Sequence, residues 1–396
     1  MEAYMIVRIQ DANILNENGE LFEGFVTFDD QSGLILNVGR GNPDNSGVTP
    51  DAEISAEGAY LFPGLIDVHT HGRAGYDFNT ADSDALADMS FAYLEKGITS
   101  VMPTLASATL EELRSAIERI EDASNKVQGA SFIGVHLEGR YLNVQKRGAH
   151  NAELIAPLDP SELDTLFNGV KLPIHISAAF ELDKDAAFAA KAKEYGATLG
   201  LGHSCATYAE ALKAEEMGVT SYTHLMNAMP PLHHREGGAV LRALTGDKYC
   251  ELICDGIHIC PEMVELAYRM AGTDRLVLIS DSMEATGCPD GNYTIAGMPV
   301  VVTGGKAYTT DGALAGSTLS LFDAVKNLAH FCNIPIEKAI LCATANPAKM
   351  IGIYNSVGSV TEGKRADMCI VDRNTLQLQL TVSRGRFCTV DNNAAD

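Results

Sequence analysis

Residues 60–72 read YLFPGLIDVHTHG, an apolar run that ends in two histidines one residue apart. Such a run predicts a buried β-strand, with His69 and His71 at its carboxyl end. Side chains at positions i and i+2 of a strand point to the same side, so both imidazoles can reach one metal ion. The stretch therefore predicts a strand that supplies two ligands to a metal site.

The middle of the chain repeats a pattern in which a short apolar strand is followed by a longer amphipathic stretch. We expect strands at residues 60–68, 98–103, 131–137, 173–177, 197–202, 219–223, 249–254 and 276–280. Helices are expected between them, at residues 82–96, 110–124, 183–195, 208–217 and 261–271. Eight such units over roughly 290 residues are the number that closes an α/β (β/α)8 TIM barrel. An open doubly wound sheet is the structural alternative, but it gives no reason for eight units.

Both ends of the chain have a different pattern, in which short stretches alternate in period two between turn clusters. Strands are expected at residues 5–10, 21–28 and 34–38, and again at 358–360, 367–372, 376–383 and 386–390. Neither end is long enough to build a sheet core alone. We therefore expect residues 1–57 and 354–396 to form one small β-sandwich domain, with residues 58–353 inserted as the barrel domain.

A glycine-rich interruption follows the eighth strand. Residues 283–316 carry short β runs at 300–303 and 306–309, and they precede a helix expected at 318–332. An insert of this kind above a barrel is expected to act as a lid over the site.

Composition excludes several classes of protein. The 396 residues include 29 Lys and Arg against 52 Asp and Glu, a formal net charge of −23. Binding to nucleic acid or to anionic membranes needs basic surface, so neither partner is expected. The nine cysteines contain no C-x-x-C pair, which is typical of reduced thiols. Because the chain has no leader-like start and no run of ~18 apolar residues, we expect a cytoplasmic protein.

Side chains that ligate metals stand at the ends of five predicted strands. They are His69 and His71 after the first strand, Glu138 after the third, His203 after the fifth, His224 after the sixth and Asp281 after the eighth. The carboxyl ends of barrel strands face one mouth, so these side chains are expected to converge. Four imidazoles and two carboxylates exceed the three protein ligands of one catalytic zinc. The set suits two ions bridged by the glutamate and a hydroxide, or one ion with vestigial ligands.

Groups that can bind an anion are expected at the same mouth. Arg235 and His258 suit a phosphate through charge-assisted hydrogen bonds, and the backbone N–H groups around Asn227 and Ala228 can add to that cradle. His150, in the long loop after the third strand, is placed to reach a substrate carbonyl. Other candidates receive a structural interpretation: His175 and His330 as hydrogen-bonded residues, His233 and His234 as capping or packing residues, and Lys146 and Arg147 as a solvated loop face.

Taken together, these motifs resemble those of the amidohydrolase superfamily, and within it the N-acetylglucosamine-6-phosphate deacetylase family. The segments that carry the resemblance are 63–72 (PGLIDVHTHG), 136–139 (HLEG), 148–151 (GAHN), 202–204 (GHS), 223–229 (THLMNAM), 233–236 (HHRE), 255–258 (DGIH), 280–283 (SDSM) and 313–317 (ALAGS). The resemblance implies hydrolysis of the acetamide of N-acetylglucosamine 6-phosphate, a step of amino-sugar catabolism that gives glucosamine 6-phosphate and acetate.

The resemblance also assigns roles residue by residue. Glu138, His203 and His224 match the principal metal ligands, while His69 and His71 match histidines that some members use for a second ion. Asp281 matches the catalytic acid and base, and also stands in the metal set. His150 matches the contact to the acetamido carbonyl, and the sugar-phosphate contacts are matched by Asn227, Ala228, Arg235 and His258.

Further implications concern the metal and the assembly. One or two divalent ions are expected per subunit, with zinc as the first choice and iron, manganese or cobalt as alternatives. In relatives the matching arginine reaches across a dimer interface, so a homodimer is implied, with Arg235 acting on the neighbouring site.

Two departures from the family pattern are visible. The family usually reads Glu-Gly-Pro-Phe where this chain has Glu138-Gly139-Arg140-Tyr141, which puts a cation near the site and could favour an N-acetylgalactosamine 6-phosphate. The family usually has Pro-Gly where this chain has Gly237-Gly238, which loosens the loop holding Arg235. The alternatives are a dihydroorotase-like or D-aminoacylase-like enzyme, and a non-enzymatic binding or scaffold protein on the same shell.

Overall fold

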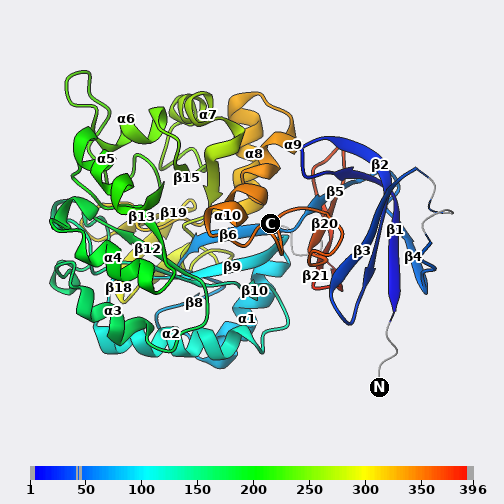
Figure 1. Ribbon diagram of the computed structural model, residues 1–396, viewed down its shortest axis with the longest axis horizontal. Helices are drawn as coiled ribbons and strands as arrows, with labels where there is room; N and C mark the ends of the chain where they lie inside the picture. Colours follow the sequence, from blue (N-terminus) through cyan, green and yellow to red (C-terminus); the bar gives the residue numbers. More distant parts are fainter. Residues whose placement is uncertain (1–4, 42, 44–46, 390–396) are drawn as a thin grey trace.

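The computed structural model describes residues 5–41, 43 and 47–389. Two parts are visible in Figure 1: a large barrel ringed by helices, and a smaller sheet in which blue N-terminal strands lie beside red C-terminal ones. Within the described residues, no helix has the length and apolar character needed to cross a membrane.

Eight parallel strands form the barrel, as predicted. Their bounds are β6 Leu65–Thr70, β9 Ile98–Leu105, β11 Val135–Glu138, β12 Ile174–Ala178, β13 Thr198–Leu201, β14 Val219–Tyr222, β15 Tyr249–Ile253 and β16 Leu276–Ile279. A two-residue strand, β10 (Ser131–Phe132), also pairs with β9. The ring closes between the last strand and the first, where the backbone N–H of Asp281 donates to the carbonyl oxygen of His69 at 2.9 Å. All carboxyl ends therefore face one mouth.

The helices cover the outside of the barrel. They are α1 Ser83–Leu94, α2 Leu110–Ser124, α3 Pro160–Phe167, α4 Ala187–Glu194, α5 Tyr208–Met217, α6 Gly238–Thr245, α7 Pro261–Arg275, α8 Leu321–Cys332, α9 Ile336–Leu341 and α10 Ala345–Met350. In α2, Thr109 and Glu112 form a reciprocal capping box, and Leu113, Ile117 and Ile120 are buried on one face. The predicted helices are present in place, whereas α3, α6, α9 and α10 were not predicted.

The smaller part is a single hydrogen-bonded sheet built from both chain ends. Its strands are β1 Ile6–Leu15, β2 Leu21–Asp29, β3 Leu34–Arg40, β4 Ala52–Ser55, β5 Tyr60–Pro63, β20 Met368–Val371, β21 Leu378–Ser383 and β22 Arg386–Thr389. The ring of Phe28 in β2 lies 5.8 Å from that of Phe387 in β22, so the sheet folds back on itself. A separate apolar core that includes Ile9, Val26 and Ile370 lies inside it.

Three expectations about strands need correction or comment. The predicted strand 60–68 is two strands, because β5 pairs with β1 and β20 in the terminal sheet and only β6 enters the barrel. Pro63 has no N–H to continue a ladder, and a Cβ at Gly64 would lie 2.3 Å from Oγ1 of Thr99. The strand predicted at 358–360 is wrong, since these residues form a bend instead. The division into domains at residues 57 and 354 stays a prediction, and residue 390 of the last predicted strand lies outside the described residues.

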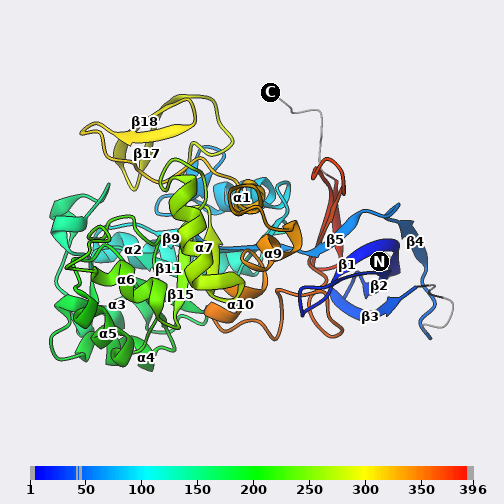
Figure 2. The same cartoon turned by 90° about the horizontal axis from the view of Figure 1, so that it is seen from above.

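The insert after β16 is a three-stranded antiparallel sheet that stands off the barrel (yellow in Figure 2). Its strands are β17 Gly291–Ile295, β18 Met298–Thr303 and β19 Lys306–Thr309, so the predicted hairpin is confirmed and a third strand precedes it. Ile295, Val300 and Val302 bury a small core of its own. A short hairpin, β7 Gly72–Arg73 with β8 Tyr76–Asp77, follows β6 at the same mouth.

Candidate metal centre and substrate cavity

One carboxylate joins two groups of histidines at the barrel mouth. Oε2 of Glu138 lies 2.9 Å from Nε2 of His71 and 3.2 Å from Nε2 of His69. Its other oxygen, Oε1, lies 2.9 Å from Nε2 of His224 and 3.1 Å from Nε2 of His203. The structure thus brings these five predicted ligands into one cluster, with Glu138 between the two pairs.

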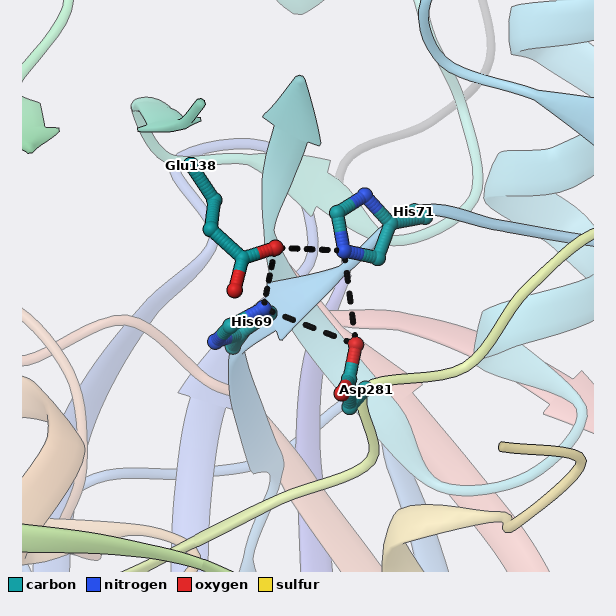
Figure 3. Close-up of side chains that lie close together, drawn as sticks. All are labelled: His69, His71, Glu138 and Asp281. Carbon is teal, nitrogen blue, oxygen red and sulfur yellow. Dashed lines mark ion pairs between the residues drawn. The ribbon is translucent and has the colours of Figure 1, made fainter. Parts of the chain in front are cut away.

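Asp281 completes the first group. Its Oδ1 lies 3.3 Å from Nε2 of His71 and 3.5 Å from Nε2 of His69, opposite Glu138 in Figure 3. His69, His71, Glu138 and Asp281 are all buried, and their ligand atoms lie close enough together to share one ion. Asp281 thus joins His69, His71 and Glu138 in one group, and His203 and His224 contact the other oxygen of Glu138.

The backbone turns sharply just after the strands that precede these residues. His203, His224 and Asp281 have φ values of +45°, +30° and +49°, in the left-handed region that residues other than glycine seldom adopt. Each stands just after the end of its strand, β13, β14 and β16. Strained conformations of this kind cost free energy and concentrate at functional sites, where they aim a side chain.

The donor set fits a divalent cation. Nε2 of His203 lies 3.0 Å from Nε2 of His224. Nδ1 of His203 lies 2.7 Å from the carbonyl oxygen of Lys146, which can only accept, so Nδ1 carries the proton and Nε2 presents its lone pair to the cluster. Nε2 of His69 is buried without a hydrogen-bond partner. Imidazole nitrogens and carboxylate oxygens are ligands for zinc, iron, manganese and cobalt alike.

The charges of the two acidic ligands follow from their neighbours. Burial alone would raise the pKa of Glu138, but the imidazoles of His69, His203 and His224 outweigh it and hold that pKa well below its usual range. Burial opposes ionisation of Asp281 in the same way, and its pKa is lowered by His69 and His71. Both side chains are therefore carboxylates at neutral pH and offer anionic oxygens to a cation.

A buried acidic residue below the ligands was not predicted. Glu251, in the middle of β15, is fully buried, and its Oε2 lies 3.3 Å from Nδ1 of His69. Its Oε1 lies 3.6 Å from Nε2 of His175, whose Nδ1 is 2.9 Å from the hydroxyl of Thr198. His175 is thus a buried, hydrogen-bonded residue, as its structural interpretation expected. His330 is exposed on α8. In the sequence, Glu251 is marked only by being the one carboxylate in an otherwise mostly apolar strand.

A cavity of about 330 Å³ opens at the cluster of histidines and carboxylates. Its walls include the predicted residues His150, Asn227, Ala228 and His258. Lys146 also lines it, and its Nζ donates to the carbonyl oxygen of Met229 at 3.1 Å, so the interpretation of Lys146 as part of a solvated loop face is wrong. The cavity therefore presents polar and cationic groups beside the cluster.

His150 faces the cluster as a neutral imidazole. The backbone N–H of Ser107 donates to Nδ1 of His150 at 3.3 Å, which leaves the ring proton on Nε2. Nε2 lies 3.9 Å from Oε2 of Glu138. Burial and the neighbouring His203 lower the pKa of His150 to about 3, so the ring can donate one hydrogen bond towards the cavity without carrying charge.

The two predicted phosphate contacts are placed differently. Nδ1 of His258 lies 2.6 Å from Oδ2 of Asp255, and that contact orients the ring at the cavity wall. Arg235 is exposed, 2.6 Å from Nε2 of His234, and lines a separate depression with Tyr208. Within one chain, Arg235 therefore does not share the cavity with His258.

Arg140 does not supply the free cation that the sequence suggested. Its Nε and Nη2 donate to the two carboxylate oxygens of Glu162 in α3, each at 2.9 Å. Tyr141 donates to the same carboxylate at 2.8 Å. Arg140 is absent from the residues that line the cavity, so its charge is neutralised outside the site.

Comparisons with known proteins agree with this arrangement. The sequence profile of the amidohydrolase family matches residues 60–392. The chain is 37% identical over 316 residues to an N-acetylgalactosamine-6-phosphate deacetylase from Escherichia coli O157:H7, covering 79% of this chain and 83% of that protein. It is 33% identical over 398 residues to an N-acetylglucosamine-6-phosphate deacetylase from Bacillus subtilis (strain 168), covering 98% of each.

A solved structure has the same architecture. A variant N-acetyl-D-glucosamine-6-phosphate deacetylase from Mycobacterium smegmatis, in complex with N-acetyl-D-glucosamine-6-phosphate, matches with a TM-score of 0.86 and 28% identity, covering 97% of this chain and 99% of that one. Its likeness extends over both the barrel and the terminal sheet.

Proposed function

The chain belongs to the amidohydrolase family, and on that basis we propose that it hydrolyses the acetamide of N-acetylglucosamine 6-phosphate to glucosamine 6-phosphate and acetate. The observation that carries this proposal is the Glu138 carboxylate held between two pairs of imidazoles directly below a cavity. The names of the relatives support the substrate class.

One or two divalent ions held among His69, His71, Glu138, His203, His224 and Asp281 would supply hydroxide near neutral pH and draw electron density from a carbonyl oxygen. Zinc is the ion we propose first, because it binds imidazole and carboxylate together, and iron, manganese and cobalt are the alternatives to test. One or two ions per subunit are consistent with the two histidine pairs around Glu138.

Asp281 is proposed as the group that moves the proton. Its carboxylate faces the cavity and is ionised, so it can accept a proton from the attacking water. The water oxygen forms the new bond to the acetyl carbon. As the carbon–nitrogen bond breaks, the same carboxyl group returns the proton to the nitrogen, which leaves as the free amine.

His150 is proposed to stabilise the charge that develops on the acetyl oxygen. Its Nε2–H is fixed by the hydrogen bond at Nδ1 and needs no rearrangement during the reaction. A hydrogen bond from a donor that is already in position is stronger to the oxyanion of the transition state than to the carbonyl oxygen of the neutral amide.

The sugar phosphate is proposed to bind the polar and cationic residues of the cavity wall. His258, Lys146, Asn227 and Ala228 line the cavity. Arg235 is proposed to reach the site of the partner subunit in a homodimer, which is consistent with its exposure in one chain. We further propose that the reaction takes place in the cytoplasm, because all nine cysteines are free thiols.

An N-acetylgalactosamine 6-phosphate is the second candidate substrate. The observation that favours it is the 37% identity to a relative named for that sugar. The two sugars differ in the orientation of one hydroxyl group.

The test is an assay of acetate release from both epimers and their non-phosphorylated forms, after metal removal and reloading with zinc, manganese, iron or cobalt in turn. We expect turnover of a phosphorylated sugar only after reloading. Asp281→Asn should lower turnover at least about 100-fold while metal content stays unchanged. Absence of acetate from every sugar with every metal would instead favour a scaffold protein or another amidohydrolase reaction.

A further inference from the structure

A second, much smaller recess opens beside the main cavity. It has a volume of about 20 Å³ and shares His71, Ala149, His150 and Ile295 with the main cavity. Its other walls are the apolar side chains of Ala106, Ala296 and Met298 and the polar residues Ser107 and Asn151. We propose that this recess receives the alkyl part of the acyl group and restricts the enzyme to short acyl chains, an inference that rests on the proposed deacetylation.

The direction of the substrate follows from the two kinds of wall. The carbonyl carbon of an N-acyl sugar carries an amide nitrogen, which leads to the polar sugar, and an alkyl group. The main cavity contains Lys146, Asn227 and His258, which suit a sugar phosphate. If the carbonyl oxygen points towards Nε2 of His150 and the sugar lies in the main cavity, the alkyl group points into the recess.

The size of the recess sets the chain length. A volume of about 20 Å³ is on the order of one small group such as a methyl. A propionyl or butyryl chain adds one or two methylenes that press on the walls of the recess, where Ala106 is 4% exposed, Ile295 is 7% exposed and Met298 is half-buried. Close-packed walls resist such additions.

Hydrogen bonds tie the walls of the recess together. The backbone N–H of Ala296, at the turn between β17 and β18, donates to Oδ2 of Asp77 at 2.8 Å, and that of Asn79 donates to Oδ1 at 2.7 Å. The side chain of Asn79 in turn pairs with both the N–H and the carbonyl of Ala106, at 3.0 Å each.

The next residue, Ser107, holds His150. The tip of the insert is therefore fixed relative to the group proposed to bind the carbonyl oxygen. This chain of contacts holds the backbone at Ala106 and Ala296, two of the walls of the recess.

The experiment measures kcat/KM for N-formyl, N-acetyl, N-propionyl and N-butyryl glucosamine 6-phosphate, with release of the common free amine as the readout. For the metal-loaded enzyme we expect kcat/KM to fall by about tenfold or more from acetyl to butyryl. Met298→Ala should enlarge the recess and so reduce the ratio of kcat/KM for acetyl to kcat/KM for butyryl. Ala106→Val should fill the recess and lower kcat/KM for the N-acetyl substrate relative to the N-formyl substrate.

Val301→Ala is the matched control, because Val301 lies on the same strand β18 but is 44% exposed. It should leave the acetyl-to-butyryl ratio at the wild-type value. A flat chain-length profile in the wild type would overturn the proposal, as would equal profiles for Met298→Ala and Val301→Ala. Failure to release amine from any of the four substrates would overturn the proposed function as well, so the two failures are distinguishable.

Discussion

Glu251 reaches His69 from inside the barrel, with 3.3 Å between Oε2 of the carboxylate and Nδ1 of the imidazole. A carboxylate can only accept there, so the proton of His69 lies on Nδ1 and its Nε2 is free to bind a cation. Carboxylates behind histidine ligands fix both the tautomer and the orientation of the ring. Glu251 is therefore expected to act as a positioning residue for the metal centre.

Replacing Glu251 should weaken metal binding. Glu251→Leu leaves Nδ1 of His69 without an acceptor, and we expect the affinity of the His69 side of the centre to fall by about 10- to 100-fold. Competition with a chromophoric chelator and elemental analysis measure this directly. Glu251→Gln can still present an oxygen to Nδ1 and should be affected less; full metal content in the Leu variant would contradict the assignment.

Removing the donor at position 150 should slow the chemical step. His150→Phe is expected to lower kcat by about 100- to 1000-fold with little change in metal content, because the oxygen of the transition state loses a preorganised donor. His330→Phe is the control, since His330 is exposed on α8. A His150 variant that raises KM but keeps kcat would show that the ring binds substrate without assisting the reaction.

A hybrid dimer can reveal where Arg235 acts. Neither Asp281→Asn nor Arg235→Ala homodimers should hydrolyse the phosphorylated sugar efficiently. If Arg235 serves the neighbouring subunit, a mixed dimer contains one site with both residues intact and should regain activity. If it serves its own subunit, or if the protein is a monomer by light scattering, mixing should restore nothing.

The pair formed by Asp255 and His258 predicts a pH-dependent stability. Burial would raise the pKa of Asp255, but hydrogen bonds from His258 and from the backbone N–H groups of Ile257 and His258 hold it below its usual value. A depressed folded-state pKa contributes stability above the unfolded value of about 4, and that contribution disappears as the pH falls through the folded-state value.

Asp255→Asn should therefore destabilise the protein by about 1.5–3 kcal/mol at pH 7, measured by urea unfolding. The difference from wild type should shrink as the pH drops below about 4. The exposed Asp274, changed to Asn, should leave unfolding unaltered at both pH values. A penalty for Asp255→Asn that is equally large in acid would rule out the ionised Asp255 carboxylate as its source.

Much of the site could be predicted because its residues follow strand ends. Periodicity located the strands, and the barrel rule brought Glu138, His203 and His224 to one mouth although they are far apart in the chain. Their proximity is confirmed, while their roles as ligands stay predictions. The family resemblance is confirmed by the profile match over residues 60–392.

The features that were missed depend on contacts between distant segments. Arg140 looked like a free cation because its partner, Glu162, lies on a helix that was not predicted. Glu251 stands in an apolar strand, and periodicity alone does not say what lies beneath a ligand. Periodicity predicts a single strand over 60–68, although Pro63 and Gly64 mark the crossing from one sheet to the other.

The pairing of β5 with β20 has a consequence for how the protein is made. The ribosome releases β1 to β5 first, but β5 gains its second neighbour only when Met368–Val371 has been synthesised. Until then β5 keeps an unpaired edge, and such edges promote aggregation of nascent chains. A stop codon placed between α10 and β20 should yield insoluble protein, even though every candidate ligand up to Asp281 would already have been translated.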